Sequence, residues 1–248
     1  MMKTDLQTVM WKEWKLLFRD RASRTRTVVS LLCPILLAVY IPFEESARWV
    51  TDPILSLLPC IPTVVILVLL IIPDSFAGER ERHTLETLLA SRLPDGAILF
   101  GKVLVSVILA LGVAVLVLGV GLATVNILHW GDGPLFYSPR VLITDLVLSF
   151  FFAVITAGAG VIISLRAETA QEAQQTLMAA LMVPGLILGM IPPALLSLRP
   201  EWHGVIRETL GAVGYVEVMA VVVGVCSVLA VGLVALAMKR FQREGLIG

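Results

Sequence analysis

The chain has 248 residues, of which 58% are hydrophobic and only 15% are charged, and its mean hydropathy is +0.92. Soluble domains carry about 25% charged residues, so the composition excludes an ordinary soluble protein and indicates a membrane protein. The formal net charge is zero, so the overall charge gives no indication of a nucleic-acid partner.

The first predicted element is an amphipathic helix within residues 5–20. Apolar residues recur there at helical spacing, and Trp11 and Trp14 are among them. Basic residues fall on another face: Lys12, Lys15 and Arg19. This pattern is typical of a helix lying in the lipid headgroup region, although a helix packed only on protein fits it too. The basic residues of the segment 21–26 are expected to contact anionic lipid.

Six apolar runs follow, each a candidate for the helix of about 20 residues that crosses a bilayer. They cover residues 27–43, 53–73, 98–128, 141–165, 174–198 and 216–238. We expect Pro184 and the pair Pro192–Pro193 to break the fifth run. The sequence therefore predicts an all-α membrane protein, with an interfacial segment at residues 1–26 and a six-helix permease domain at residues 27–248. The basic segment before the first run argues against a cleavable signal peptide.

The basic residues predict the orientation of these spans. Of the 19 lysines and arginines, 15 lie in the N-terminal segment, the C-terminal tail and the connections after the second and fourth runs, counted with the edges of the adjoining runs. The other 4 lie on the opposite side. Basic residues favour the cytoplasmic side, so we expect an inner or plasma membrane protein with both termini in the cytoplasm. An even number of spans also requires both termini on one side.

The connection between the second and third runs carries the most specific pattern. Residues 79–92 are predicted to form a helix that Pro94 stops. The predicted helix and the residue after it carry an apolar stripe: Leu85, Leu88, Leu89 and Leu93. A short helix between two spans favours docking onto another protein, although an ordinary interfacial loop helix has the same pattern.

This connection resembles the ABC-2 type permease family. Members show an acidic-basic run, then Thr-Leu-Glu, two leucines, a proline and Gly-Lys. The chain matches that pattern at Glu79, Glu81, Thr84, Leu85, Glu86, Leu88, Leu89, Pro94, Gly101 and Lys102. The family often has glycine before the threonine, where this chain has His83, so the local helix geometry is open at that point.

The resemblance implies the permease subunit of an ATP-driven ABC exporter, working as a homodimer or with a paralogous permease. Each permease would bear on a separate ABC ATPase subunit, which would hold the ATP and Mg²⁺. A coupling helix at about residues 79–93 would contact that ATPase through Glu79, Arg80, Glu81, Arg82, Thr84 and Glu86. The connection after the fourth run resembles the second cytoplasmic contact, with Arg166, Glu168 and Glu172, although a plain helical connector is equally consistent.

Other motifs predict no chemistry in this chain. Residues 96–103 have P-loop spacing, but Val103 stands where a P-loop needs Ser or Thr to bind magnesium, so we expect no nucleotide site, no cofactor and no enzymatic activity. The histidines lie in separate connections and the cysteines in separate apolar runs, which predicts neither a metal site nor a disulfide. Gly185 and Gly189 have the GxxxG spacing that allows close helix contact.

The apolar runs also bear on two alternatives to the exporter, a carrier without an ATPase and an intramembrane enzyme. A secondary transporter or channel-like protein would work without an ATPase, but ion-coupled carriers need ionisable groups near the bilayer midplane. Asp145 and Glu217 lie near the ends of their runs, and the centres of all six runs lack charge. An intramembrane enzyme is disfavoured because no intramembrane catalytic motif is present. The connection 199–215 is amphipathic and predicts an external cap, although an interfacial helix without a gating role has the same pattern. The sequence identifies neither the substrate nor the residues that bind it.

Overall fold

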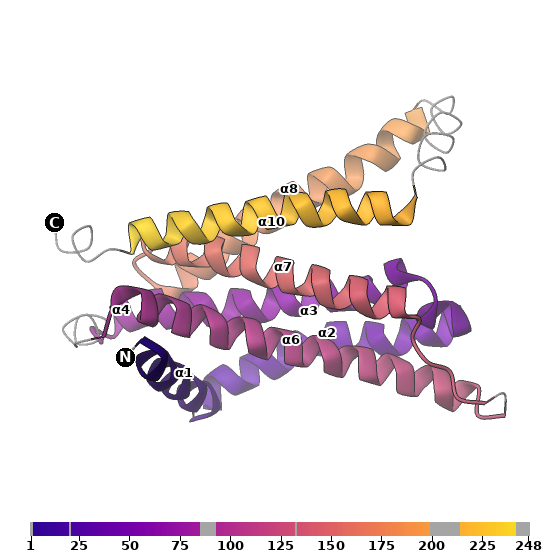
Figure 1. The fold of residues 1–248 in the computed structure, drawn as a ribbon, viewed down its shortest axis with the longest axis horizontal. Helices are drawn as coiled ribbons and strands as arrows, with labels where there is room; N and C mark the ends of the chain where they lie inside the picture. The colour runs from indigo at the N-terminus through magenta and orange to yellow at the C-terminus, as the bar shows by residue number, and fades with distance from the viewer. Residues whose placement is uncertain (1, 20, 85–92, 132, 199–213, 242–248) are drawn as a thin grey trace.

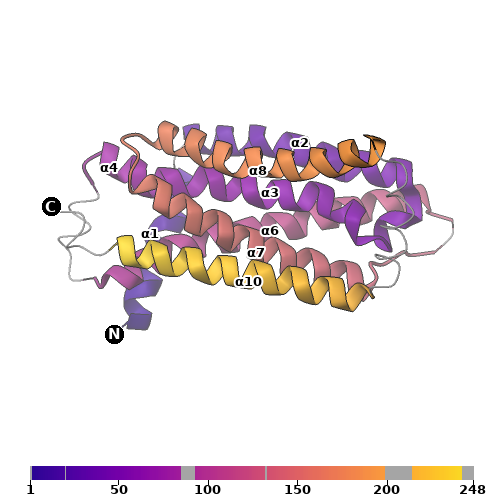
Figure 2. The ribbon, with the colours of Figure 1, turned by 90° about the horizontal axis from the view of Figure 1, so that it is seen from above.

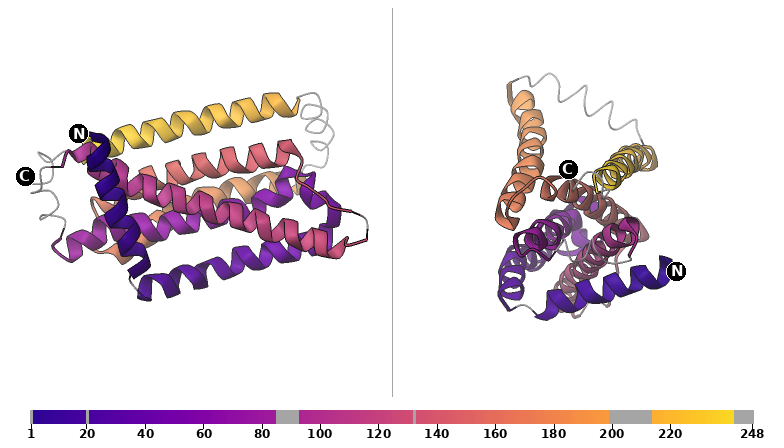
Figure 3. Two further views of the ribbon diagram at one scale, coloured as in Figure 1. Left: turned by 60° about the horizontal axis from the view of Figure 1, so that its bottom comes forward. Right: turned by 90° about the vertical axis from the view of Figure 1, so that its left-hand side faces the viewer.

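The computed structural model describes residues 2–19, 21–84, 93–131, 133–198 and 214–241. Within these ranges the chain forms helices joined by short connections, and no strand is present. Most helices run roughly along one axis (Figures 1 and 2). The first helix, α1 (Met2–Arg19), instead lies across the others at one end of the bundle (Figure 3). The all-helical class predicted from the sequence is confirmed.

The helices follow one another along the chain with two irregular turns among them. A 3₁₀ turn, η1, precedes the second long helix of the bundle, and a π turn, η2, follows it. The elements after α1 are α2 (Arg21–Glu45), η1 (Ser46–Val50), α3 (Pro53–Pro73), η2 (Asp74–Gly78), α4 (Glu79–Glu81), α6 (Asp95–Leu128), α7 (Pro139–Ser164), α8 (Ala170–Leu198) and α10 (Tyr215–Arg240).

Among the described residues, five helical stretches are long and apolar enough to cross a membrane, which makes the chain a multi-pass membrane protein. They are Val28–Val50, Pro53–Glu81, Asp95–Leu128, Pro139–Ser164 and Tyr215–Arg240. Helix α8 has 29 residues, which is also enough to cross, but it is not among the five. The sixth span therefore stays a prediction. The predicted cap at residues 199–215 lies outside the described residues, apart from its last two.

The predicted break in the fifth run is wrong. Helix α8 stays helical from Ala170 to Leu198, through Pro184 and the pair Pro192–Pro193. A proline removes one backbone hydrogen bond and crowds the preceding turn, which kinks a helix more readily than it ends one in a membrane. Helix α2 likewise continues through Pro34 and Pro42, and it begins at Arg21, inside the basic segment.

The main core lies where α3, α6 and α7 meet. Alanines at 153 and 157 let α7 approach closely, and branched side chains of α3 fill the space between the helices. The fully buried members include Val64, Leu67, Val68, Ile72, Ile98, Leu99, Ala110, Ala153, Ala157 and Val161. Helix α1 packs against α6 outside this core. Its closest contact is at Gly101, near the start of α6.

The two ends of the bundle differ, and we name them after α1 and η1. At the α1 end, the ring of Phe241, just after α10, packs edge-on against Phe76 at 5.7 Å between centroids. Helix α1 and the end of α10 therefore lie at the same end (Figure 1), as an even number of crossings predicts. At the η1 end, the fully buried Trp49 donates from Nε1 to the Tyr137 hydroxyl at 2.7 Å, which donates to the Leu118 carbonyl.

Candidate functional site

The connection that follows α3 begins as a continuation of the helix. The π turn Asp74–Gly78 leads directly into α4, which ends after Glu81. There the His83 N–H donates to the Arg80 carbonyl at 2.9 Å, and the Thr84 N–H donates to the Glu79 carbonyl at 2.9 Å. These two bonds form a Schellman motif, which ends a helix with one residue in the left-handed conformation. His83 is that residue, with φ at 55°.

The single helix predicted over residues 79–92 is therefore wrong at its start. The helix ends at Glu81, and the chain reverses at His83, while residues 85–92 lie outside the described part of the chain. The position before Thr84 is the one where the family often has glycine. A left-handed residue at the helix end explains that preference, because glycine has no Cβ to clash there. Leu93, the last residue of the predicted stripe, packs against the main core.

A buried lysine lies beside the π turn. The Lys102 side chain of α6 has no exposed surface, and its Nζ lies 3.0 Å from Glu13 Oε1 and 2.9 Å from Glu79 Oε2. It also donates to the Ser75 carbonyl, inside the π turn, at 2.8 Å. The Phe76 ring, 5.4 Å away, faces the same ammonium group. Lys102 thus joins α1, the π turn, α4 and its own helix α6.

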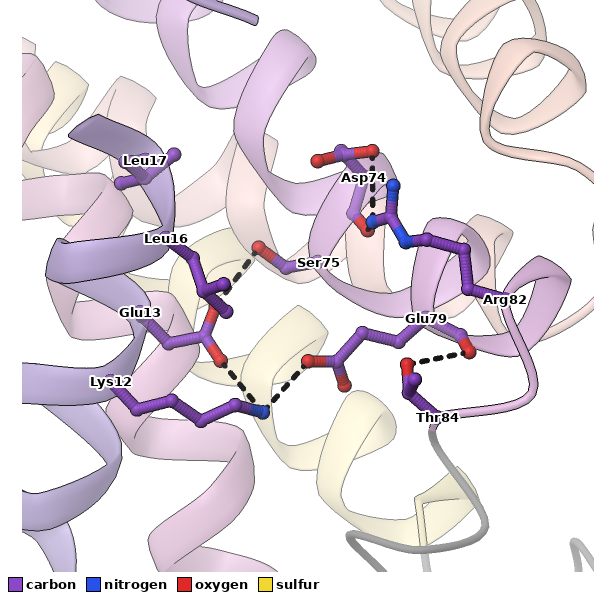
Figure 4. Close-up of a pocket in the computed structure, with 9 residues that line it drawn as sticks. All are labelled: Lys12, Glu13, Leu16, Leu17, Asp74, Ser75, Glu79, Arg82 and Thr84. Atoms are coloured by element: carbon purple, nitrogen blue, oxygen red, sulfur yellow. Dashed lines mark hydrogen bonds and ion pairs between the residues drawn. The ribbon is translucent and has the colours of Figure 1, made fainter. Parts of the chain in front are cut away.

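A second lysine balances the charge of this ion cluster, which comprises Lys12, Glu13, Glu79 and Lys102. Lys12 Nζ lies 3.0 Å from Glu79 Oε1 and 3.8 Å from Glu13 Oε1 (Figure 4). The two carboxylates are buried, whereas the Lys12 side chain keeps 41% of its surface exposed. Two cations and two anions give zero net charge. Each buried charge therefore has a partner of opposite sign, whose attraction offsets the free energy lost when the charge leaves water.

Helix α1 reaches this cluster because Gly101 lets it approach α6 closely. A Cβ on Gly101 would lie only 2.6 Å from Cγ1 of Val9, which is 2% exposed. Val9 and Glu13 are one helical turn apart, so both face α6. Trp11 and Trp14 keep 66% and 43% of their surface exposed, although both lie beside Val105 and Ile108 of α6. The Gly-Lys pair of the sequence motif thus has two roles: Gly101 seats α1, and Lys102 binds its carboxylate.

Two neighbouring residues of α4 fasten the first connection to the second. Arg80 donates to the carbonyls of Leu165 and Ala167, at 3.0 Å for the latter, where α7 has just ended. Glu81 accepts from the Ala170 N–H, the first residue of α8, at 3.3 Å. A cation at a helix C-terminus and an anion at a helix N-terminus are both favourable. The two connections therefore form one joined surface at the α1 end.

The predicted contact residues have different positions in this surface. Glu79 is buried inside the chain, and Arg80 is half-buried. Glu81, Arg82 and Thr84 are exposed, as are Arg166, Glu168 and Glu172, whereas Glu86 lies outside the described residues. Glu172 accepts from the Glu168 N–H at 2.9 Å and so helps to start α8. The exposed residues are free to meet a partner, but Glu79 is held by lysines of its own chain.

A cavity of about 410 Å³ lies beside the cluster, between α1 and the π turn (Figure 4). Most of its lining residues are charged or polar and two are leucines of α1, but the surface that they turn to the cavity is largely apolar. The lining residues are Lys12, Glu13, Leu16, Leu17, Asp74, Ser75, Glu79, Arg82 and Thr84. Arg82 pairs with Asp74 at 3.3 Å across its rim. Sequence reasoning did not identify Glu13, although an acid one turn after Val9 on the packed face signals a buried partner.

The comparisons with known proteins agree with the sequence motif. No curated protein matches the chain. Residues 4–208, which are most of the chain and include α1, the ion cluster and both joined connections, match the family described as ABC-2 type transporter. The chain therefore belongs to the ABC-2 type transporter family, as a multi-pass permease component of a transporter.

Proposed function

We propose that this chain is the permease subunit of an ATP-driven ABC exporter, coupled at its α1 end to a separate ATPase subunit. The family supports transport as the function. The observation that carries the proposal is the joint made by Arg80 and Glu81, which fastens the first connection to the second. A partner that pushes on either connection would move the ends of α3, α7 and α8 together.

The exposed polar residues of both connections suit such a partner. They are Glu81, Arg82 and Thr84 in the first connection and Arg166, Glu168 and Glu172 in the second. Charged groups at an interface contribute mainly to specificity and to the rate of association. ATP and Mg²⁺ belong to the ATPase in this proposal. Glu79 has a different role from the one that the motif implies, because it holds the connection to its own bundle.

The proposed exporter is a dimer of permeases in the inner or plasma membrane, with the α1 end in the cytoplasm. Helix α2 leaves an apolar groove of about 750 Å³ open on its outer face, lined by residues such as Leu36 and Tyr40. A Cβ added to Gly185 of α8 would meet no atom within 4 Å, so the surface there is free for another helix. Both surfaces suit a second copy or a paralogous permease, since small and apolar residues let membrane helices pack.

The coupling proposal is tested by charge reversal at the first connection. In the variant Glu81→Lys/Glu86→Lys, we expect the permease to insert and dimerise, but its ATPase to co-purify poorly. Like charges would then face the partner at a desolvated contact. The measurement is the amount of ATPase recovered per permease, together with ATP hydrolysis in vesicles. Normal recovery and normal hydrolysis would contradict docking at this connection.

The matched control is Glu81→Gln/Glu86→Gln. Glutamine keeps an oxygen that can accept from the Ala170 N–H, so α8 keeps its N-terminal contact. Loss of ATPase binding in the lysine variant alone would therefore show that loss of the negative charges is tolerated and that the added positive charge, at the partner or at the N-terminus of α8, is what prevents binding. The change Leu88→Asp/Leu89→Asp gives a second comparison, because charge on the predicted apolar stripe should prevent stable assembly of the permease itself.

A second candidate function is an ion-coupled carrier that works without an ATPase, and Asp145 favours it. Asp145 in α7 is fully buried, and neither carboxyl oxygen has a hydrogen-bond partner among the described residues. Ionisable groups inside a membrane protein are commonly functional. Asp145→Asn should leave ATPase-driven transport intact if the exporter proposal holds. A carrier that uses Asp145 would lose coupling to its ion in the same variant, as measured by ion-driven uptake in vesicles.

A further inference from the structure

The π turn between α3 and α4 is held by a side chain from another helix. The backbone hydrogen bonds of a π turn join residues five apart, whereas those of an α-helix join residues four apart. Such turns are uncommon within α-helices and frequent at functional sites. In Asp74–Gly78, the Ser75 carbonyl accepts from Lys102 Nζ at 2.8 Å. Figure 4 shows the Ser75 hydroxyl turned toward Glu13 of the cluster, to whose Oε2 it donates at 3.5 Å. The irregular turn and the buried lysine of α6 therefore belong to one structure.

Close packing inside the π turn fixes its shape further. A Cβ on Gly78 would lie 2.7 Å from Asp74 Oδ1 and 3.0 Å from Arg82 Nη2. The Asp74–Arg82 ion pair thus runs over Gly78 and spans the turn on its exposed side. Lys102 holds the same turn on its buried side. The turn is thus held from both sides, mainly by the buried Lys102 and only weakly by the exposed Asp74–Arg82 pair, and these contacts position α4 relative to α6.

Ionic contacts from this connection reach some helices but not others. Lys102 and Glu79 link it to α6 and, through Glu13 and Lys12, to α1. Helix α10 meets it through the apolar contact of Phe241 with Phe76. Apolar surfaces can slide past one another, whereas a buried lysine with three short polar contacts has one well-defined position. Movement of α4 would therefore carry α6 more directly than α10.

We propose that Lys102 is the positioning residue through which movement of the ATPase-bound connection reaches α6, by locking the π turn, Glu79 and Glu13 into one unit. This inference rests on the proposed coupling to an ATPase. Lys102 itself need not touch the ATPase or the substrate, because its side chain is wholly buried. Its role is to make α6 follow α4, so that closure of the ATPase subunits changes the membrane-spanning part.

The variant that tests this role is Lys102→Met/Glu13→Gln. It removes one charge of each sign, which leaves the Lys12–Glu79 pair intact and the cluster neutral. Methionine keeps most of the lysine volume but cannot donate to the Ser75 carbonyl. The double variant therefore removes the link without leaving an unpaired buried charge. The matched control is Arg48→Gln, which removes an exposed ion pair with Glu45 at the η1 end.

The readout is a distance between spin labels on α6 and α10. Cysteines replace Leu116 and Val228, which are 67% and 74% exposed, in an otherwise cysteine-free protein. The permease–ATPase complex is placed in vesicles of phosphatidylethanolamine and phosphatidylglycerol, and the distance is measured with and without trapping of the ATPase by ADP and vanadate. In the unaltered permease and in Arg48→Gln, we expect trapping to shift the distance. In Lys102→Met/Glu13→Gln, we expect equal nucleotide trapping but no shift.

Each outcome decides the matter. A double variant whose labels shift as in the unaltered permease would overturn the positioning role, since the link would then be dispensable. A double variant that fails to assemble with its ATPase would also overturn it, because Lys102 would then serve folding alone. If the unaltered permease binds no ATPase, the proposed function fails first, and the positioning role falls with it. A variant that is only less stable would not combine normal trapping of nucleotide by the ATPase with an unchanged distance between the labels on α6 and α10.

Discussion

At the residue scale, the ion cluster depends on every member because three of its four side chains are buried. Lys102 is 1% exposed, Glu13 5% and Glu79 6%. Removing one partner of a buried ion pair typically costs about 3–5 kcal/mol, because the other charge is left uncompensated. An exposed pair such as Glu45–Arg48 typically contributes less than about 1 kcal/mol. The cluster is therefore sensitive to the loss of any one buried member, although the complete cluster need not add much net stability.

Another residue-scale prediction concerns the helix end at His83. We expect His83→Gly to raise the free energy of unfolding by up to about 1 kcal/mol, because a left-handed conformation costs an L-residue about 1–2 kcal/mol and glycine almost nothing. His83→Val should lower it, since a branched side chain fits that conformation poorly. Thermal unfolding of the purified permease in detergent measures both changes. Equal midpoints for all three proteins would contradict the left-handed conformation at this position.

Ser46 provides the control for that prediction. It also has a left-handed backbone, with φ at 56°, but its hydroxyl lies 2.7 Å from His129 Nε2. Ser46→Gly relieves the backbone and removes a hydrogen bond, and the two effects are of similar size. We therefore expect little net change there. A gain at His83 without a gain at Ser46 would assign the effect to backbone conformation.

Some of the site residues could be predicted from the sequence, and others could not. Glu79, Gly101 and Lys102 were identified because they lie in a recognisable motif. Their pairing was not, because Glu13 and Lys102 are 89 positions apart and meet only where α1 crosses α6. Periodicity assigns a face to a residue, but it does not say which neighbour covers that face. The burial of Glu79 was missed for the same reason.

At the element scale, the seating of α1 on α6 is testable through Gly101. Gly101→Val should displace α1, because even its Cβ would overlap Val9 at 2.6 Å. Overpacking of this kind typically costs about 1–3 kcal/mol. Val9→Ala should restore part of the loss in the double variant, because it removes the methyl groups that clash. The thermal midpoint measures stability, and tryptophan emission reports the position of α1, which carries Trp11 and Trp14.

The double-variant comparison decides whether the effect is local. Two residues in direct contact show a coupling energy that separate sites do not. If Val9→Ala gives no rescue, the close approach of α1 to α6 is not what Gly101 provides. The exposure of both tryptophans agrees with the predicted interfacial helix, although its place in the headgroup region stays a prediction.

The elements themselves were predicted unevenly. Apolar runs located the long helices well, since burial of about 20 residues in lipid leaves a strong sequence signal. The π turn and the early end of α4 left no such signal. They depend on Lys102 reaching Ser75 and on a helix-ending residue, His83, that is not a glycine. The continuous α8 shows the converse, because a proline removes one backbone hydrogen bond and can kink a helix without ending it.

At the scale of the whole molecule, α6 sets the dimension of the bundle. Its 34 residues would extend about 51 Å at 1.5 Å per residue, against about 30 Å for the hydrocarbon core. The helix must tilt or extend beyond the core. Lys102 lies within its first turns, so the ion cluster falls near the membrane surface and not at its centre. That depth allows Lys12 to stay partly exposed while its partners are buried.

The last prediction is the orientation of this bundle. We expect both termini in the cytoplasm, because 15 of the 19 basic residues lie on the predicted inner side. A membrane-impermeant maleimide added to right-side-out cells should not label single cysteines replacing Lys3 or Gly248 in a cysteine-free protein. A cysteine replacing Trp130, which is 86% exposed at the η1 end, should be labelled.

The three positions together separate the possible topologies. Labelling at Trp130 alone agrees with six spans and with an ATPase at the α1 end. Labelling at Lys3 and Gly248 but not at Trp130 would invert the bundle, and the joined connections would then face away from any cytoplasmic ATPase. Labelling at only one terminus would mean an odd number of crossings. Because α8 is not among the five candidate spans, α8 would then be the first helix to test for a failure to cross.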